Sequence, residues 1–344
     1  MHNHLLLIDG SALLSSCFFG NLPMAYKLAR TDEEKDLYLD KLLQSPDGQY
    51  TNGVFTMLSS MLNVIKKQKP THIAVAWDLT KESTFRKKLY PEYKGQRKNF
   101  RAELGNQFPL AQEVLKEMGI SEFVFSEYEA DDIIGTIARK FENDIRVTIW
   151  TKDQDSLQLI DENIRVWLIT SKCTEMYLDL EINTKLFNIP TGVFEFTPSY
   201  IEDYYGIAPI QIIDKKAIEG DPSDNIPGVS GVGEKSVIPL LKEFKTVEGI
   251  YDFIENSSEK EIKEMFKLLG ITRSPLSKLI EESDTKLVGK KAALLCKQLT
   301  TIKCDIPELQ NISLDSLKLN LNKVGMRAVF EKLGFNSLLK TMEK

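Results

Sequence analysis

Leu5-Leu6-Leu7-Ile8-Asp9-Gly10 is an apolar run that stops at an acidic residue, and the same pattern recurs twice further along the chain. It returns as Ile73-Ala74-Val75-Ala76-Trp77-Asp78, and again as Val147-Thr148-Ile149-Trp150, which leads into Thr151-Lys152-Asp153-Gln154-Asp155. Short apolar runs that end in turn residues predict buried strands of a parallel sheet. The chain therefore presents three predicted strands whose carboxyl ends carry acids.

These strand-end acids are Asp9, Asp78, Asp153 and Asp155. In an open parallel sheet, ligand sites gather outside the carboxyl ends of the strands, so we expect the four carboxylates to lie together. A single strand-end Asp is explained equally well as the cap of the next helix. The repetition of the pattern favours a shared site.

Helical patterns alternate with the strands. Apolar residues recur at helical spacing from Val54 to Ile65, from Leu110 to Met118 and from Ile133 to Phe141, and further strands are predicted at Phe123–Phe125 and Ile164–Ile169. This alternation predicts an α/β domain with a mainly parallel sheet. After about residue 190 the strand signals fade, and helical segments punctuated by Gly and Pro predict a second, mostly helical region.

The composition argues against several other kinds of site. The chain has 344 residues, a net charge of −6, four scattered cysteines without a CxxC pair, and three histidines. Such cysteines argue against a disulfide scaffold or a thiolate zinc site and favour a reducing, cytoplasmic location. So few histidines argue against a His-built metal site or a catalytic triad. No apolar stretch is long enough to cross a bilayer, and the N-terminus does not have the pattern of a signal peptide.

Two further groups of acids lie away from the predicted strand ends. Glu129, Asp131 and Asp132 open a helix, where acids suit the helix dipole, but three carboxylates in four residues repel one another and favour a bound cation. Asp221 and Asp224 lie in a turn. An all-oxygen set selects hard cations such as Mg²⁺ or Mn²⁺, and its size suits two ions about 4 Å apart in phosphodiester hydrolysis.

A basic segment and a glycine-punctuated loop complete the pattern. From Lys81 to Arg101 there are eight basic residues and two acidic ones, a local balance of +6. Aromatics interleave with cations in Tyr90-Pro91-Glu92-Tyr93-Lys94-Gly95-Gln96-Arg97, which suits stacked bases and phosphates, although a solvated charged helix is the alternative. The loop Ile226–Lys235, IPGVSGVGEK, enters a helix, and a helix N-terminus favours a phosphate.

Together these motifs resemble the 5′ nuclease family, which includes the 5′→3′ exonuclease domain of bacterial DNA polymerase I, phage 5′ exonucleases and flap endonucleases. The matching segments cover roughly residues 4–306 in the family's order. They are LLLIDGSAL, HIAVAWD, STFRKKLYPEYKGQR, YEADDIIGTIA, TKDQDSLQL, EGDPSDNIPGVSGVGEK and QLTTIKCDI.

The resemblance implies a PIN-like, mainly parallel sheet flanked by helices in residues 1–190, with a helical arch at about 80–105. It implies a helical DNA-binding region at 191–306 with a helix–three-turn–helix at about 211–245, and a C-terminal helical extension at 307–344. The implied activity is Mg²⁺-dependent, structure-specific hydrolysis of DNA as a 5′→3′ exonuclease and flap endonuclease.

The resemblance also implies roles for individual residues. A first metal cluster would comprise Asp9, Asp78, Glu129 and Asp131, with Asp132 close by, and a second would comprise Asp153, Asp155, Asp221 and Asp224. Arg86, Lys94, Arg97 and Tyr93 would lie near the scissile phosphate or the unpaired strand. Gly228, Gly231, Gly233 and Lys235 would grip duplex DNA beside a bound K⁺.

Two departures from the family pattern stand out. Ser15-Ser16 replace a Tyr-Arg pair that usually follows the first acid, so a phosphate or base contact is expected to be missing or supplied elsewhere. Residues near 24–48 also look like an insertion of about twenty residues, for which a surface excursion is expected.

The expected partners are DNA 5′ ends, flaps and junctions, with the RNA strand of an RNA–DNA hybrid as an additional candidate. The chain is expected to act as a monomer without a membrane. Two alternative functions stay open: a non-catalytic DNA-junction binder of the same fold, and a PIN-like ribonuclease. The complete set of carboxylates disfavours the first, and the glycine loop disfavours the second.

Overall fold

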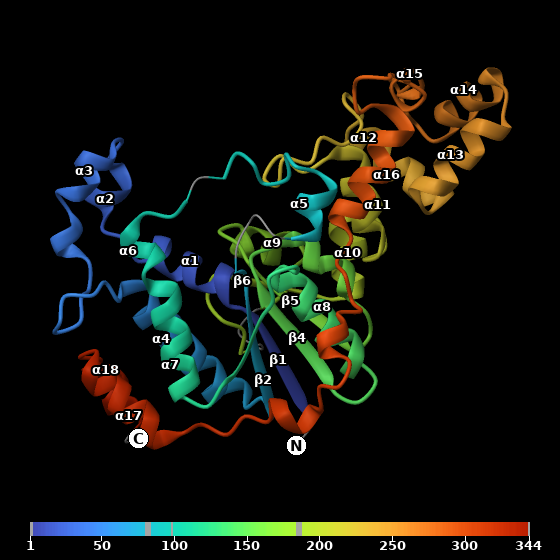
Figure 1. The fold of residues 1–344 in the computed structure, drawn as a ribbon. Helices are drawn as coiled ribbons and strands as arrows, with labels where there is room; N and C mark the ends of the chain where they lie inside the picture. The colour runs from blue at the N-terminus through green and yellow to red at the C-terminus, as the bar shows by residue number, and fades with distance from the viewer. Residues whose placement is uncertain (1–2, 80–83, 98, 184–187, 343–344) are drawn as a thin grey trace.

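A single sheet organises the chain, whose computed structural model describes residues 3–79, 84–97, 99–183 and 188–342. The sheet has the strand order β3-β2-β1-β4-β5-β6 (Figure 1). Neighbouring strands pair in parallel except β6, which is antiparallel to β5. The strands are β1 (His4–Asp9), β2 (His72–Trp77), β3 (Ser121–Val124), β4 (Arg146–Thr151), β5 (Ile164–Ile169) and β6 (Val193–Phe196).

This topology confirms the predicted α/β class and the predicted strands β1 to β5. It adds one strand that the sequence pattern did not predict, β6, which closes the edge of the sheet just after residue 190. The missed strand is only four residues long, and Pro198 starts a helix directly after it. Its length does not explain the miss, because β3 is equally short and was predicted; β6 lies beyond the point where the strand signals of the sequence fade.

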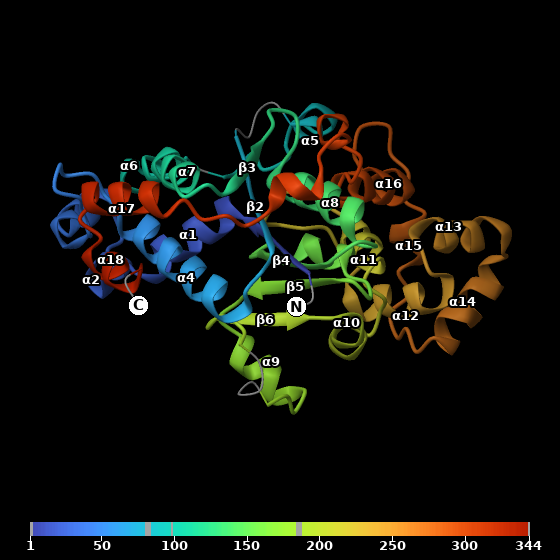
Figure 2. The ribbon, with the colours of Figure 1, turned by 90° about the horizontal axis from the view of Figure 1, so that it is seen from below.

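Alternating side chains of the strands bury the two faces of the sheet against different helices. Leu6 and Ile8 pack in the same apolar cluster as α1 and α4, whereas Leu5 and Leu7 pack with α8. Figure 2 shows these helices on either side of the strands. The helices between the strands are α1 (Gly10–Gly20), α4 (Asn52–Gln68), α7 (Gln107–Glu117), α8 (Ala130–Phe141), the 3-10 helix η2 (Gln154–Leu159) and α9 (Cys173–Asp179).

Helices dominate the second half of the chain and extend beyond the carboxyl ends of the strands (Figure 1). The pair α11 and α12 encloses the glycine loop, within the region predicted for the helix–three-turn–helix. These helices are α10 (Pro198–Tyr205), α11 (Gln211–Glu219), α12 (Glu234–Phe244), α13 (Val247–Asn256), α14 (Glu259–Leu268), α15 (Leu276–Leu279) and α16 (Gly289–Thr300).

The C-terminal part returns to the α/β domain. It contains η4 (Pro307–Leu309), η5 (Leu314–Leu317), α17 (Lys323–Lys332) and α18 (Asn336–Met342). Lys318 forms a β-bridge with His72, and α17 contacts α7. In the described part of the chain, we find no helix that is both long and apolar enough to span a membrane.

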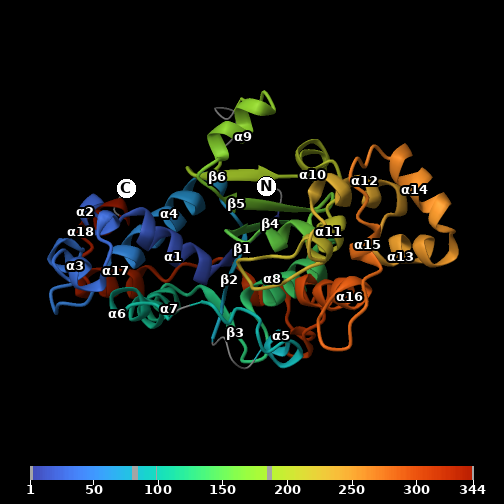
Figure 3. The same cartoon turned by 90° about the horizontal axis from the view of Figure 1, so that it is seen from above.

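The insertion and the basic segment form short helices: α6 of the basic segment lies beside α2 and α3 of the insertion, whereas α5 lies away from them, near α8 and α16 (Figure 3). Residues 80–83 and 98 of the expected arch lie outside the described residues, and the rest contains two helices joined by irregular chain. The insertion contains α2 (Met24–Leu28), α3 (Asp32–Asp36) and η1 (Leu39–Lys41), and the basic segment contains α5 (Phe85–Leu89) and α6 (Ala102–Gly105).

Candidate nuclease active site

The carboxyl ends of β1, β2 and β4 bring their acids to one edge of the sheet. Asp9 caps α1, and its two oxygens accept hydrogen bonds of 2.8 Å from the Ala12 amide and the Thr151 hydroxyl. Asp78 accepts a 2.9 Å bond from the Ala130 amide at the start of α8. The order of the strands therefore places the first turn of α8 beside the acids that end β1 and β2.

Three carboxylates have the geometry of a candidate metal site. One oxygen from each of Asp131, Asp153 and Asp155 lies within 4.8 Å of the other two. Asp131 Oδ1 is buried without a hydrogen-bond partner. An acceptor of this kind is costly to bury, and a bound cation would offset the cost. The group joins residues that the family resemblance divides between two metal clusters.

The buried acids resist ionisation in the absence of a cation. Burial and the charge of Asp78 raise the pKa of Asp9 to about 7. Burial also raises the pKa of Asp155 to about 7, against the opposing charge of Lys216. Burial and the charge of Asp132 raise the pKa of Asp131 well above its usual range. A divalent cation would favour the ionised forms of all three groups.

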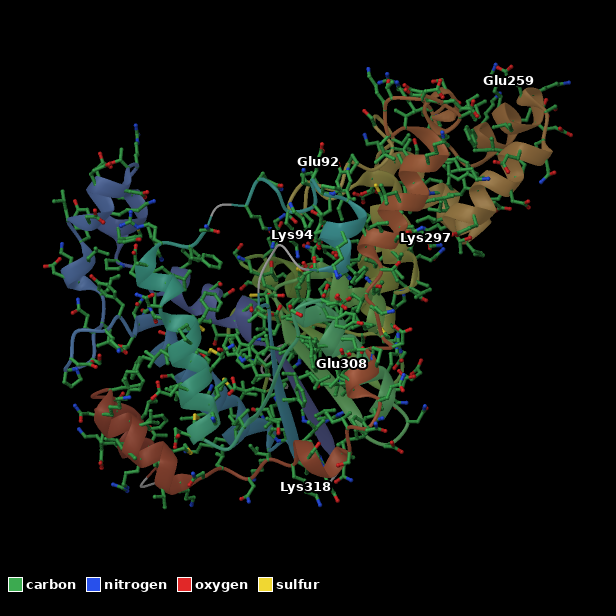
Figure 4. The ribbon with its side chains drawn as sticks, in the orientation of Figure 1. Glu92, Lys94, Glu259, Lys297, Glu308 and Lys318 are labelled. Carbon is green, nitrogen blue, oxygen red and sulfur yellow. The ribbon has the colours of Figure 1, made fainter. Side chains whose placement is uncertain are left out.

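The basic segment places three of its predicted site residues, Tyr93, Lys94 and Arg97, in contact with the acids. Lys94 Nζ lies 2.9 Å from Glu129 Oε1 and 3.5 Å from Asp224 Oδ2, above the carboxyl ends of the strands (Figure 4). The Tyr93 hydroxyl donates to the same two carboxylates at 2.8 and 3.1 Å. Arg97 pairs with Asp224. Although burial opposes the effect, Lys94 and Arg86 hold the pKa of Glu129 below its usual range.

Arg86 occupies a different environment from these cations. Its side chain is 2% exposed, and it donates to both Asp132 oxygens, at 2.7 and 2.8 Å. It also donates to the carbonyls of Leu299 and Thr301 near the end of α16. Asp132 accepts two further bonds, from the backbone amides of Glu129 and Lys303. The pair joins α5, α8 and the end of α16 behind the acids.

Two residues of the site carried no assignment in the sequence analysis. Lys216 on α11 pairs with Asp155 and lies 2.8 Å from Asp221 Oδ2. Although burial opposes it, Lys216 lowers the pKa of Asp221 to about 2. Thr151 is buried between Asp9 and the Asp153 amide, to which it is bonded at 3.0 Å. Thr151 follows a predicted strand directly, a position that would have justified its inclusion, whereas nothing in the pattern singles out Lys216.

The predicted DNA-binding loop lies between α11 and α12. Gly228 is buried at a φ of +62°, and an added Cβ would lie 2.3 Å from the Gly220 amide nitrogen, so only glycine fits. Gly231, Gly233 and Lys235 are exposed, and Gly233 caps the N-terminus of α12. None of these three shares a described contact with the acids, so the loop forms a separate surface beyond Asp221 and Asp224.

The arrangement combines a negative centre with an adjacent positive segment. Carboxylates from the ends of three strands, from α8 and from the turn at 221–224 meet around Lys94, Arg97 and Lys216. These carboxylates, ammonium and guanidinium groups supply oxygens for a hard cation and positive charge for an anionic substrate.

Comparisons with known proteins agree with this site. The family model described as "5'-3' exonuclease, N-terminal resolvase-like domain" matches residues 4–186, and the model "5'-3' exonuclease, C-terminal SAM fold" matches residues 207–324. The chain therefore belongs to the 5′-3′ exonuclease family of nucleases. This confirms the resemblance, the PIN-like sheet and the nuclease class expected from the sequence.

Relatives by sequence are longer proteins. DNA polymerase I of Bacillus subtilis (strain 168) is 35% identical over 340 residues, which cover 98% of this chain and 32% of that protein. DNA polymerase I of Bacillus caldotenax is 32% identical over 345 residues, which cover all of this chain and 33% of that protein. The chain thus spans about a third of the length of the curated relatives that it matches.

Solved structures share the fold at lower identity. A T5 5′-exonuclease described with bound zinc ions has a TM-score of 0.57 and 18% identity, over 96% of this chain and all of that one. The T5 D15 flap endonuclease in a pseudo-enzyme-product complex with DNA and metal ions has a TM-score of 0.56 and 19% identity, over the same shares. At these identities the likeness shows the fold.

Proposed function

We propose that this chain hydrolyses DNA phosphodiester bonds as a structure-specific 5′→3′ exonuclease and flap endonuclease that uses two divalent ions. The observation that carries the proposal is the convergence of Asp131, Asp153 and Asp155 around a buried carboxylate oxygen without a partner. Hard cations prefer such an oxygen set, so we propose Mg²⁺, with Mn²⁺ as a substitute.

The donor set fits the proposed ions. Asp9, Asp78, Glu129 and Asp131 would hold one ion, and Asp153, Asp155, Asp221 and Asp224 the other. When bound, the ions supply an activated water and stabilise the leaving oxygen. Asp132 is instead proposed to position Arg86, because both of its oxygens already accept bonds from Arg86 and from the backbone.

The basic side chains have the task of holding the substrate. In the absence of DNA, Lys94 and Arg97 pair with Glu129 and Asp224. Cations bound at these carboxylates would free the side chains of Lys94 and Arg97 to contact the scissile phosphate. Their positive charges would then neutralise the negative charge that grows on the phosphate as the bond breaks. Tyr93 would position Glu129 and Asp224 through its hydroxyl. We propose that Arg86, which Asp132 holds in place, does not contact the phosphate.

The glycine loop is proposed to hold duplex DNA next to the cleavage site. Gly231, Gly233 and Lys235 expose backbone and an ammonium at the start of α12, where phosphates bind favourably. We propose a monovalent ion, K⁺, in this loop. A structural neighbour with a TM-score of 0.50 and 13% identity is described as a eukaryotic junction-resolving enzyme, GEN-1, binding with cesium, another monovalent cation.

The proposed function is tested with a DNA flap labelled at both ends. Wild-type protein should cut it near the 5′ branch with Mg²⁺ or Mn²⁺, and excess chelator should abolish cutting. Binding without cutting under both ions would favour the non-catalytic junction binder. Preferential cutting of single-stranded RNA would favour the alternative function of a PIN-like ribonuclease. Cutting of the RNA strand in an RNA–DNA hybrid would show that such hybrids are an additional substrate.

The ions, the assembly state and the location are tested separately. Electron paramagnetic resonance of Mn²⁺ should count two bound ions in the wild type and fewer in an Asp131→Asn variant. A mass of 39.2 kDa in light scattering of the active protein would support the proposed monomer. The four free cysteines agree with the proposed cytoplasmic location, which fluorescent tagging in cells would test.

A further inference from the structure

The insertion at 24–48 grips the C-terminal end of the basic segment. Tyr26 of α2 is buried, and its hydroxyl donates to Glu103 Oε1 at 2.5 Å. Arg101 Nε lies 2.6 Å from the same oxygen. Glu103 is itself buried, so this contact anchors Arg101 to a fixed point of the fold.

Two acids of α3 complete the environment of Arg101. One guanidinium nitrogen lies 3.0 Å from Asp32 Oδ1, and the other pairs with Asp36. A capping box between Thr31 and Glu34 stabilises the N-terminus of α3. Isolated surface ion pairs contribute little, but one arginine shared by three carboxylates in a network has a more defined geometry.

The same end of the basic segment also packs against β2, the strand that ends just before Asp78. Phe100 stacks on Phe108 with ring centroids 5.3 Å apart. Phe108 meets the edge of Trp77 at 6.3 Å, and Trp77 is the last residue of β2. The contacts of the insertion therefore act on a part of the chain that is already packed against the site.

The other end of the segment rests on the turn that contains Asp224. The Lys94 amide donates to the Asp224 carbonyl at 2.8 Å, and Asn225 Nδ2 donates to the Glu92 carbonyl at 2.8 Å. Only four residue steps separate Arg97 from Arg101, a reach of at most about 14 Å. Figure 1 shows residues 90–97, which follow α5, passing above the carboxyl ends of the strands. The short connection therefore limits how far Arg97 can move while Arg101 is anchored.

We propose that the insertion is a positioning element for cleavage, in which Tyr26, Asp32 and Asp36 act through Arg101 and Glu103 to hold Lys94 and Arg97 over the acids. This inference rests on the proposed nuclease function. Side chains held in their working positions before substrate binds lose less entropy in the reaction. Loss of the contacts that hold Arg101 should therefore lower kcat more than it changes KM.

The test compares Arg101→Gln with Arg139→Gln. Arg139 is a matched control, because its side chain is 30% exposed, against 28% for Arg101, and it pairs with two acids, Glu142 and Asp161, where Arg101 pairs with three. We expect Arg101→Gln to lower the single-turnover rate on the labelled flap by about tenfold or more with little change in KM, and Arg139→Gln to leave the rate unchanged. Arg101→Lys should restore part of the rate.

A double-mutant comparison of Arg97 and Arg101 distinguishes a positioning role of Arg101 from a general loss of folding. In an Arg97→Gln background, Arg101→Gln should lower the rate by much less than in the wild type, because independent distant sites add whereas coupled ones do not. Hydrogen exchange gives a readout without activity: the Lys94 amide should exchange faster in Arg101→Gln and not in Arg139→Gln. The exposed pair Asp32→Asn with Asp36→Asn should reproduce both effects if Arg101→Gln folds poorly.

The outcomes are distinguishable. Equal rates and equal exchange in Arg101→Gln and Arg139→Gln, or full additivity with Arg97→Gln, would overturn the positioning role while the wild type still cuts. A wild type that cuts no substrate would refute the proposed function instead, and the exchange measurement would still decide whether the anchor holds Lys94.

Discussion

Arg86 and Asp132 form a fork-to-fork ion pair, at 2.7 and 2.8 Å, with both side chains removed from solvent. The pair is located directly behind Glu129 and Asp131 in the first turn of α8. A buried pair of this kind fixes geometry more reliably than it adds stability. It therefore holds the acidic turn of α8 against α5 and the end of α16, where Leu299 and Thr301 complete the hydrogen bonds of Arg86.

Removal of one partner should be severely destabilising. Asp132→Asn leaves the buried Arg86 charge with only the longer 3.4 Å pair to Glu129, which costs about 3 kcal/mol. Urea denaturation would measure the loss. Asp161→Asn is the control, because it removes an acid from the partly exposed Arg139 pair and should cost less than about 1 kcal/mol. Equal, small losses in the two variants would show that the Arg86 pair is not structurally important.

Metal-free protein should lose stability as the pH rises. The pKa values of Asp9 and Asp155, about 7 in the folded chain, lie above the ordinary value of 3.8. The folded state therefore binds protons more tightly, and its stability falls between about pH 4 and pH 7, by about 1.4 kcal/mol per pKa unit and group. Denaturation in chelator at pH 5 and pH 8 tests this, and Asp9→Asn should flatten the profile.

Added Mg²⁺ should reverse that trend. The ion binds ionised carboxylates, so its affinity and its stabilising effect grow with pH. A metal-free protein that is as stable at pH 8 as at pH 5 would contradict the environment described for Asp9 and Asp155.

Lys216 should compete with divalent ions for Asp155 and Asp221. Its replacement in Lys216→Met removes the charge that neutralises both acids, so the affinity for Ca²⁺ should rise by about tenfold, the equivalent of about 1.4 kcal/mol. Titration calorimetry would measure it. Lys215→Met is a matched control, because Lys215 pairs with Glu219 on the same helix, and should leave the affinity unchanged. Equal affinities in both variants would exclude the competition.

Two glycines of the DNA-binding loop should respond differently to substitution. An added Cβ at Gly228 would lie 2.3 Å from one backbone atom and 2.5 Å from another, at a positive φ, whereas Gly233 has open space around it. Gly228→Ala should therefore lose at least about 1–3 kcal/mol of folding stability together with duplex affinity. Gly233→Ala should fold normally, as thermal denaturation and duplex titration would show. A Gly228→Ala protein with native stability would refute the close approach to Gly220.

The sequence was most informative where chemistry and periodicity coincided. Asp9 and Asp78 follow apolar runs that predict buried strands. The carboxyl ends of parallel strands lie at the same edge of a sheet. The meeting of these acids at one edge of the sheet was therefore predictable from the amino-acid sequence alone. The grouping of Asp131 with Asp153 and Asp155 was not, because it depends on how α8 is rotated against β4.

Contacts between distant segments could not be predicted in the same way. The family resemblance implied that Arg86 lies near the substrate, yet three of its neighbours, Asp132, Leu299 and Thr301, come from elsewhere in the chain. Lys216 differs from Lys215 only in the face of α11 on which it lies, and that face is set by packing. Strand β6 lies beyond the predicted end of the α/β domain, and its antiparallel pairing with β5 is what assigns it to the sheet.

The central claim is that the converging carboxylates cut DNA, and cleavage by an Asp153→Ala variant tests it most directly. On a flap labelled at its 5′ and 3′ ends, with Mg²⁺, the variant should lose nearly all cutting while its affinity for the flap, measured in Ca²⁺, stays close to that of the wild type. Undiminished cutting by Asp153→Ala would contradict the account.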